Sequence, residues 1–544
     1  MARSAASISI GKKIKTKRQQ WVGDERTIVF DPDGIRSALM QLHLPCYILK
    51  RGEKVGAANR GVLTEAEAQE GESYYSVPFA FPLTEQDLGD PGFKKDYNLK
   101  YAYIGGSMAN GISSEGMVIA LGKAGYLASF GAGGLLPARI EQAIRTIQKE
   151  LPQGSYAFNL IHSPFVEALE RKTVDLYLKH RVRVIEASAY INLTPHVVYY
   201  RVAGLKLYDG NRIHISNRII AKVSRREVAE KFMSPAPESI LKYLTEQGRI
   251  DQQQAEWARQ VPMADDITVE ADSGGHTDNR PLVALFPSIR TLRDEMQEKY
   301  RYAYPIRIGA AGGIGTPESA LAAFMMGAAY IMTGSINQAC IESGTSEQVK
   351  QILSQADMAD VTMAPAADMF EMGVKLQVLK RGTLFPMRGQ KLYDLYQAYD
   401  RIENIPSAER EKLEKQIFRA DLDTVWQETV RFFQDRDQSQ IERAARNPKK
   451  RMAMVFRWYL GLSSQWANIG KKGREMDYQI WCGPSMGAFN GWTRNSFLEK
   501  PPNRMVATVA KQMLTGVAYL YRLQLLKMQQ VSFPPCFDHY RPTP

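Results

Sequence analysis

The stretch PIRIGAAGGIGTPESALAAFMMGAAYIMTGS, from Pro305 to Ser335, decides how this chain folds. A short apolar run leads through a glycine-rich loop into a segment of helical period, in which Thr316 is expected to be the N-cap and Pro317 the first helical residue. Gly327 ends that helix, and a second apolar run follows it. The pattern predicts a strand, a helix and a second strand.

The same alternation extends over about 235 residues, from Tyr101 to Ser335, and contains eight apolar runs. The expected strands are 101–106, 126–130, 156–161, 182–187, 218–223, 267–270, 306–309 and 329–333. One of the intervening helices begins with Pro137 at its first position and stops before Pro152. Eight β/α units of this total size predict a TIM (β/α)8 barrel, with an open doubly wound sheet as the structural alternative.

Other regions surround this α/β core. Residues 1–98 are rich in Pro, Gly and aromatic residues and are expected to form a separate, irregular N-terminal subdomain, and 99–340 the barrel. Within the barrel, 234–266 is too long for a plain connection and is expected to be an insertion. Residues 341–544 predict a mainly helical region, interrupted by a hairpin-like stretch at 374–386.

The composition is that of an ordinary globular chain of 544 residues, 44% hydrophobic and 24% charged, which excludes disorder and fibre. The four cysteines show no CxxC spacing and no nearby histidine that would complete a zinc site, so neither a disulfide framework nor a metal is expected. The longest nearly uncharged apolar stretch, 320–332, is shorter than the roughly 20 residues of a membrane span. Without a secretory h-region, the sequence predicts a cytoplasmic protein.

The net charge of +12 is unevenly distributed. Residues 440–544 hold 16 Lys and Arg against 5 Asp and Glu, a net +11, so the rest of the chain is close to neutral. A cluster at the start of this region contains Arg443, Arg446, Lys449, Lys450 and Arg451. Because no base-stacking aromatic motif accompanies the cluster, a solvated or partner-facing surface is favoured over nucleic-acid binding.

The loops after the seventh and eighth strands predict a phosphate site, because TIM barrels commonly hold phosphate there. Gly312 and Gly313 follow the seventh strand, and Gly334 and Ser335 follow the eighth. Glycines let backbone N–H groups approach an anion at a helix N-terminus. The alternative is that these glycines only form tight turns. It is less favoured because both loops fall at the positions where a barrel would hold phosphate.

The other strand ends carry small or polar residues. Asn159, Glu186 and Lys222 lie at or near the ends of the third, fourth and fifth strands. His276 follows two glycines after the sixth strand and is the candidate catalytic histidine, although a loop histidine is more often structural or exposed. Lys222 could stabilise negative charge on an electron-accepting ring or form an ion pair with Glu186, and both interpretations stay open.

Two rival motifs are not satisfied. GxGxxG fails around Gly131 and around Gly313, so a Rossmann dinucleotide fold has no support in the sequence. Cys482 has no recognisable base partner, which favours a packed structural thiol over a nucleophile.

Several motifs resemble the flavin-binding set of the nitronate monooxygenase and FMN-dependent enoyl-ACP reductase superfamily. They are Met108-Ala109, Phe158-Asn159, Ser273-Gly274-Gly275-His276, Ala311-Gly312-Gly313-Ile314 and Thr333-Gly334-Ser335. Longer segments, 161–191, 373–388 and 455–492, resemble the PfaD-type family, the free-standing enoyl reductases of polyunsaturated fatty acid synthases and of some modular polyketide synthases. The resemblance covers about residues 100–530.

The resemblance implies an FMN barrel that uses NADPH to reduce the α,β double bond of an enoyl thioester on an acyl carrier protein. It implies that His276 is catalytic and that the helical region 341–544 forms a substrate-binding lid over the barrel. It also implies that phosphate is held by Gly312, Gly313, Gly334 and Ser335, and that the ring and ribityl chain contact Ser107, Met108, Ala109, Asn159, Lys222, Gly274 and Gly275. Whether Ser107 or Met108 faces the flavin is left open.

Carrier proteins are typically acidic, so the basic cluster at 443–451 is expected to steer the carrier. The alternatives are a nitronate monooxygenase-like flavin oxidase and a non-catalytic docking component of a synthase. The sequence does not separate fatty acid from polyketide synthesis or NADPH from NADH, and it is compatible with a homo-oligomer.

Overall fold

The computed structural model describes residues 9–10, 18–66, 77–162, 167–208, 212–434 and 437–544. Eight parallel strands close into a barrel, which confirms the predicted TIM fold and excludes the open sheet. The strands are β7 (Tyr103–Gly105), β8 (Leu127–Phe130), β9 (Ala157–Ile161), β10 (Val184–Ser188), β13 (Arg218–Val223), β14 (Asp266–Glu270), β15 (Arg307–Ala311) and β16 (Ile331–Thr333). Each of them overlaps one of the eight expected runs.

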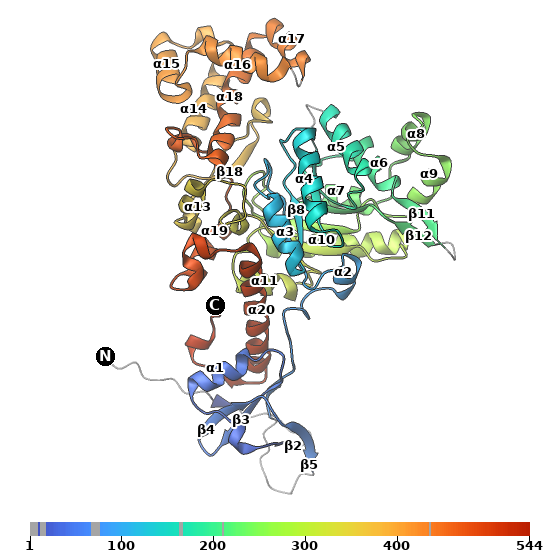
Figure 1. Ribbon diagram of the computed structural model, residues 1–544, viewed down its shortest axis with the longest axis vertical. Coiled ribbons are helices and arrows are strands. Elements are labelled where there is room, and N and C mark those ends of the chain that lie inside the picture. Colours follow the sequence, from blue (N-terminus) through green and yellow to red (C-terminus); the bar gives the residue numbers. More distant parts are fainter. Residues whose placement is uncertain (1–8, 11–17, 67–76, 163–166, 209–211, 435–436) are drawn as a thin grey trace.

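Helices connect and surround these strands (Figure 1). They are α3 (Glu115–Ala124), α4 (Pro137–Glu150), α5 (Glu167–Lys179), α6 (Pro195–Val202), α7 (Arg226–Met233), α10 (Leu282–Tyr300) and α11 (Pro317–Met325). Pro137 and Pro317 occupy first helical positions as expected, and Thr316 caps α11 through Ser319. Between α7 and β14 lie α8 (Glu238–Glu246) and α9 (Gln252–Ala258), whereas the hairpin β11 (Leu205–Tyr208) and β12 (Arg212–Ile215) was not expected.

The barrel is filled by side chains and closed at its N-terminal end. Seven strands each contribute one residue to an interior apolar cluster: Ile104, Leu127, Ala157, Val184, Ile220, Ala311 and Met332. Below them, Phe93 of α2 (Pro91–Asp96) and Tyr97 enter the same cluster. Because this end is filled, the opposite end, where the strands terminate, is the expected place for an active site.

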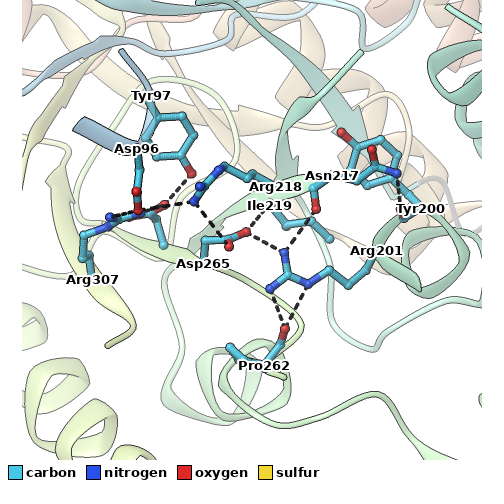
Figure 2. Close-up of polar contacts among 11 residues, drawn as sticks. Asp96, Tyr97, Tyr200, Arg201, Asn217, Arg218, Ile219, Pro262, Asp265 and Arg307 are labelled. Atoms are coloured by element: carbon cyan, nitrogen blue, oxygen red, sulfur yellow. Dashed lines mark hydrogen bonds and ion pairs between the residues drawn. The ribbon is translucent and has the colours of Figure 1, made fainter. Parts of the chain in front are cut away.

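A charge network, buried in part, surrounds Tyr97 at this end of the barrel (Figure 2). Arg201 pairs with Asp265 at 2.6 Å and also donates to the carbonyl oxygens of Pro262 and Asn217. Arg307 pairs with Asp96 at 2.7 Å. Arg218 lies 3.4 Å from Asp96 and 3.8 Å from Asp265, so it links the two halves of the network. In TIM barrels this end serves stability rather than chemistry, so the network is expected to stabilise the barrel.

The N-terminal region is more regular than expected and packs on the last long helix. It contains β2 (Arg18–Val22) paired with β5 (Val62–Ala66), a sheet of β3 (Cys46–Arg51), β4 (Lys54–Ala58) and β6 (Phe79–Ala80), and helix α1 (Pro32–Met40). α20 (Val506–Met528) lies against it, between this region and the barrel in Figure 1. Strand β1 (Ser9–Ile10) pairs with β19 (Val531–Ser532) at the same place.

The rest of the C-terminal region is mainly helical. Its helices are α12 (Ser335–Gln338), α13 (Glu347–Ser354), α14 (Phe385–Ala398), α15 (Ser407–Lys412), α16 (Leu422–Gln434), α17 (Gln438–Arg446), α18 (Pro448–Ile469) and α19 (Ser485–Thr493). The predicted hairpin at 374–386 was wrong in its extent. β18 (Lys375–Leu379) pairs instead with the earlier strand β17 (Val361–Pro365), and α14 begins at Phe385 because Pro386 suits the first turn of a helix. Among the described residues, no helix is long and apolar enough to cross a membrane.

Candidate active site

Polar side chains from neighbouring strands meet at the C-terminal mouth of the barrel. Glu186 on β10 is almost fully buried and accepts hydrogen bonds from the backbone N–H of Ser107 at 2.9 Å and from its hydroxyl at 2.7 Å. Asn159 on β9 donates to the Glu186 carbonyl oxygen at 3.1 Å and to the Ser188 hydroxyl at 2.8 Å. The Ser107 hydroxyl therefore faces Glu186.

Lys222 lies between two carboxylates at this mouth. Its ammonium is 2.7 Å from Glu270 and 3.8 Å from Glu186, so the ion pair with Glu186 weighed from the sequence is present and Glu270 is the nearer partner. Burial disfavours the charged form, but the two carboxylates outweigh burial and raise the pKa of Lys222 above its usual value. Lys222 is therefore held in its charged form between the two carboxylates.

The glycine loops after β15 and β16 form an open cradle. Gly312 and Gly313 both have positive φ, and Gly312 packs so closely on the Ala271 backbone that a Cβ would lie 2.6 Å from it. At Gly313 and Gly334, by contrast, a Cβ would meet no atom within 4 Å. Gly275, after β14, is equally open. Three glycines thus leave space on the same face of the barrel, beside backbone N–H groups.

A segment from the C-terminal region, Trp481–Ser485, crosses these loops. The Gly483 N–H donates to the Ser335 hydroxyl at 3.1 Å, and Gly274 packs on the backbone of Cys482. Burial raises the pKa of Cys482 to about 12, so its thiol stays protonated, in keeping with a packed structural cysteine. Sequence reasoning assigned this segment no role at the site, and its only signal was the run of glycines that close packing requires.

His276 lies at the edge of the same mouth, with its side chain about one-third exposed. Its Nε2 is 3.1 Å from a carboxylate oxygen of Asp368, a residue of the β17–β18 connection that the sequence did not single out. Burial opposes protonation of the imidazole, but the hydrogen bond and charge of Asp368 outweigh it and raise the pKa of His276. His276 is therefore suited to carry a proton near neutral pH.

The remaining candidates occupy defined but different positions. Met108 is half-buried, donates its N–H to the Ser113 hydroxyl at 2.9 Å and packs against the main core. Ala109 lies beside the loop after β8, where a Cβ on Gly133 would be 3.3 Å away.

Open glycine loops, polar strand ends and a protonatable histidine meet at one mouth of this TIM barrel, the end at which barrel enzymes commonly hold phosphate and place their catalytic residues. The model of the nitronate monooxygenase family matches residues 93–392. The model of the N-terminal domain of the fatty acid synthase subunit PfaD matches residues 21–78. The chain belongs to the PfaD-type enoyl reductases, with a barrel of the nitronate monooxygenase family.

The relatives agree with this assignment. The chain is 46% identical, over 96% of its length, to a subunit of the polyunsaturated fatty acid synthase of Thraustochytrium sp.. It is 46% identical, over 83% of its length, to the polyketide biosynthesis protein PksE of Bacillus subtilis. It spans only 35% of the first protein and 58% of the second.

Two further likenesses concern the structure and the helical region. The crystal structure of the enoyl reductase domain of MlnA, from the macrolactin cluster of Bacillus amyloliquefaciens, is 43% identical with a TM-score of 0.77 and covers 82% of this chain and 99% of that domain. Residues 399–478 match the model of the inserted helical domain of [acyl-carrier-protein] S-malonyltransferase.

Proposed function

We propose that this chain is an FMN-dependent enoyl reductase, which uses NAD(P)H to reduce the α,β double bond of an enoyl thioester carried by an acyl carrier protein in polyunsaturated fatty acid or polyketide synthesis. The observation that carries the proposal is the open glycine cradle with protonatable His276 at the same barrel mouth. The likeness to the MlnA enoyl reductase domain supports the reaction class.

The residues present fit FMN, because the open sides of Gly275, Gly313 and Gly334 leave room that no protein atom fills. Gly312, Gly313, Gly334 and Ser335 would hold the phosphate through backbone N–H groups and the serine hydroxyl. The residues that would contact the ring and ribityl chain are Ser107, Met108, Ala109, Asn159, Lys222, Gly274 and Gly275. Bound FMN would supply a two-electron carrier that takes hydride from NAD(P)H and passes it to the β-carbon of the enoyl thioester.

His276 would supply the proton. Hydride addition at the β-carbon generates an enolate, which must be stabilised at the thioester oxygen or protonated at the α-carbon. Because Asp368 raises the pKa of His276, the imidazolium is available to donate to that carbon. Lys222, fixed by Glu270 and Glu186, would stabilise negative charge on the ring above the mouth.

The helical region is the proposed docking surface for the carrier protein, and its likeness to the helical domain of an [acyl-carrier-protein] S-malonyltransferase supports this role. In the structure, three of the five residues of the predicted basic cluster at 443–451 have partners in other parts of the chain. Lys450 pairs with Glu371, Arg451 lies 4.0 Å from Asp423, and Lys449 donates to backbone carbonyls.

Arg443 and Arg446 remain on the exposed face of α17, and within the described part of the chain neither forms an ion pair with a carboxylate. They are the proposed steering charges.

An anaerobic half-reaction assay tests the function. The FMN-loaded protein is reduced with NADPH and then mixed with a crotonyl or longer enoyl thioester. Reoxidation by the thioester is expected, with one saturated product per flavin. Reoxidation by air alone would favour a flavin oxidase, and a protein that binds no FMN on reconstitution would favour a docking component.

A further inference from the structure

His276 and Asp368 come from different parts of the chain. His276 belongs to the loop after β14 in the barrel, whereas Asp368 belongs to the connection between β17 and β18 in the C-terminal region. Their side chains meet at 3.1 Å, between His276 Nε2 and an Asp368 carboxylate oxygen. The C-terminal region therefore reaches into the candidate site with a charged group.

The β17–β18 hairpin also fixes the loop that carries the histidine. Gln377 on β18 exchanges two backbone hydrogen bonds with Gly275, at 2.9 and 2.7 Å. The Gln377 side-chain amide donates to the Asp272 carboxylate and to the Ser273 carbonyl oxygen, both at 2.8 Å. One hairpin thus holds the backbone next to His276 and also supplies the carboxylate that meets its ring.

The Asp368 connection is itself anchored on both sides. The Ala366 N–H donates to the Val374 carbonyl oxygen at 2.9 Å, which closes the base of the connection. Phe370, two residues after Asp368, is fully buried against Tyr396 of α14 and Phe456 of α18. Asp368 is therefore held in place before any ligand binds, as an orienting group must be.

We infer that Asp368 is the positioning residue of His276: it orients the imidazole through Nε2 and stabilises its protonated form, so that the C-terminal region completes the proton donor of the barrel. The inference rests on the proposed function for the role of that proton. Asp368 acts through His276 and is not itself assigned a contact with substrate.

The charged groups around the pair favour this arrangement. Glu270 acts with Asp368 to favour the imidazolium, whereas Lys222 opposes it. Burial works against the charge of Asp368, but the hydrogen bond from His276 and the nearby Arg457 outweigh burial and lower the pKa of Asp368. Because Asp368 is ionised and hydrogen-bonded to the imidazole, its effect together with that of Glu270 exceeds the opposing effects of burial and Lys222, and the pKa of His276 is raised.

The reduction step that the His276–Asp368 pair would serve balances in electrons and protons. Hydride derived from NAD(P)H forms the new C–H bond at the β-carbon, and the π-electron pair of the double bond moves toward the thioester as an enolate. Those electrons then take the proton from the His276 imidazolium and form the C–H bond at the α-carbon. Neutral His276 stays paired with Asp368 and regains a proton from solvent.

A titration tests the pairing without any substrate. Histidine is isotopically labelled, the His276 signal is assigned from its loss in His276→Gln, and its apparent pKa is measured by NMR in the whole protein. Asp368→Asn is expected to lower that pKa, and Asp368→Glu to restore most of it. Asp423→Asn, which removes an exposed carboxylate of the same helical region, is the matched control and should leave it unchanged. An identical titration in Asp368→Asn and wild type would overturn the inference.

Kinetics test the consequence. In Asp368→Asn the enoyl-dependent reoxidation is expected to slow about tenfold at pH 8 but less than about twofold at pH 6, because the lost stabilisation matters only where the imidazole deprotonates. Reduction of the flavin by NADPH should not change. Equal slowing at both pH values would show that Asp368 does not act on the proton and would refute the inference. If wild type fails to reduce any enoyl thioester, the proposed function fails, while the titration still decides the pairing.

Discussion

Replacing Asp266 by Asn would test whether the closed end of the barrel serves stability alone. Asp266 is fully buried on β14 and receives Arg307 in a two-pronged contact, Nε to one carboxylate oxygen at 2.6 Å and Nη2 to the other at 3.1 Å. The Tyr97 hydroxyl donates to the same carboxylate at 2.5 Å. The substitution keeps the shape of the side chain but removes its charge and one acceptor, which leaves the Arg307 guanidinium short of a partner.

Removing one member of a buried ion pair costs about 3–5 kcal/mol. Asp96 still lies 2.7 Å from Arg307, so the lower end of this range, about 3 kcal/mol, is expected. With an unfolding entropy of about 2.1 cal/mol/K per residue over a barrel of about 235 residues, this loss lowers the melting temperature by about 6 °C.

The assay is thermal unfolding followed by circular dichroism, together with enoyl reduction at 25 °C. The matched control is Asp96→Asn, which removes a carboxylate from the same network at a site more than one-third exposed and should cost about 1 kcal/mol or less. Turnover at 25 °C should stay within about twofold for both variants, because the proposed chemistry lies at the opposite end of the barrel. Equal melting temperatures for the two variants would refute the reasoning, as would a loss of turnover in a folded Asp266→Asn protein.

Four further outcomes are expected away from the closed end of the barrel. Gly313→Val fills the open side of the cradle and should abolish retention of FMN, measured by flavin absorbance after gel filtration, whereas a flavin content equal to that of wild type would contradict the cradle. Lys222→Met removes the fixed cation and should lower the flavin midpoint potential in a redox titration; an unchanged potential would place the flavin elsewhere. The raised pKa of His276 adds stability below its unfolded pKa of about 6.5, and this stability is lost as the pH rises through the folded value. His276→Gln should therefore lower the urea midpoint more at pH 5.5 than at pH 8.5, and an equal loss at both pH values would contradict the raised pKa. Reversing Arg443 and Arg446 to Glu should raise the apparent KM several-fold for a carrier-bound enoyl but not for a small thioester, and an equal rise for both would count against steering.

The barrel was predictable because its signals are local. Each strand is a short apolar run, and each helix start carries its own cap, as at Thr316 and Pro317. The positions of the glycine loops follow from the strand order, since the C-terminal ends of parallel strands meet at one mouth. Asp368, Gln377 and the Trp481–Ser485 segment were not predictable in this way, because only tertiary contacts between distant parts of the sequence bring them to that mouth.

The net positive charge of residues 440–544 also shows the difference between what local sequence predicts and what tertiary contacts decide. Charge counting placed +11 in residues 440–544 and suggested a basic surface. Two of these charges, Arg504 and Arg522, are almost completely buried. Arg522 donates to the carbonyl oxygens of Leu39, Gln41, Leu42, Leu44 and Phe81, which joins α20 to the N-terminal region. Because carbonyl oxygens are neutral, such an arginine raises the net charge without adding to the surface that a partner meets.

The C-terminal region therefore contributes residues to the candidate site, in addition to the lid that the family resemblance implies. Three of its segments meet the barrel mouth: the Asp368 connection at His276, Gln377 at the loop before it, and Trp481–Ser485 at Gly274 and Ser335. Without them the loop after β14 would lose the side-chain and backbone bonds that fix it, and Gly274 would lose the backbone on which it packs. A barrel reduced to residues 99–340 would lose Asp96 and Tyr97 from the charge network at its closed end, and it would have no element to orient the proposed proton donor.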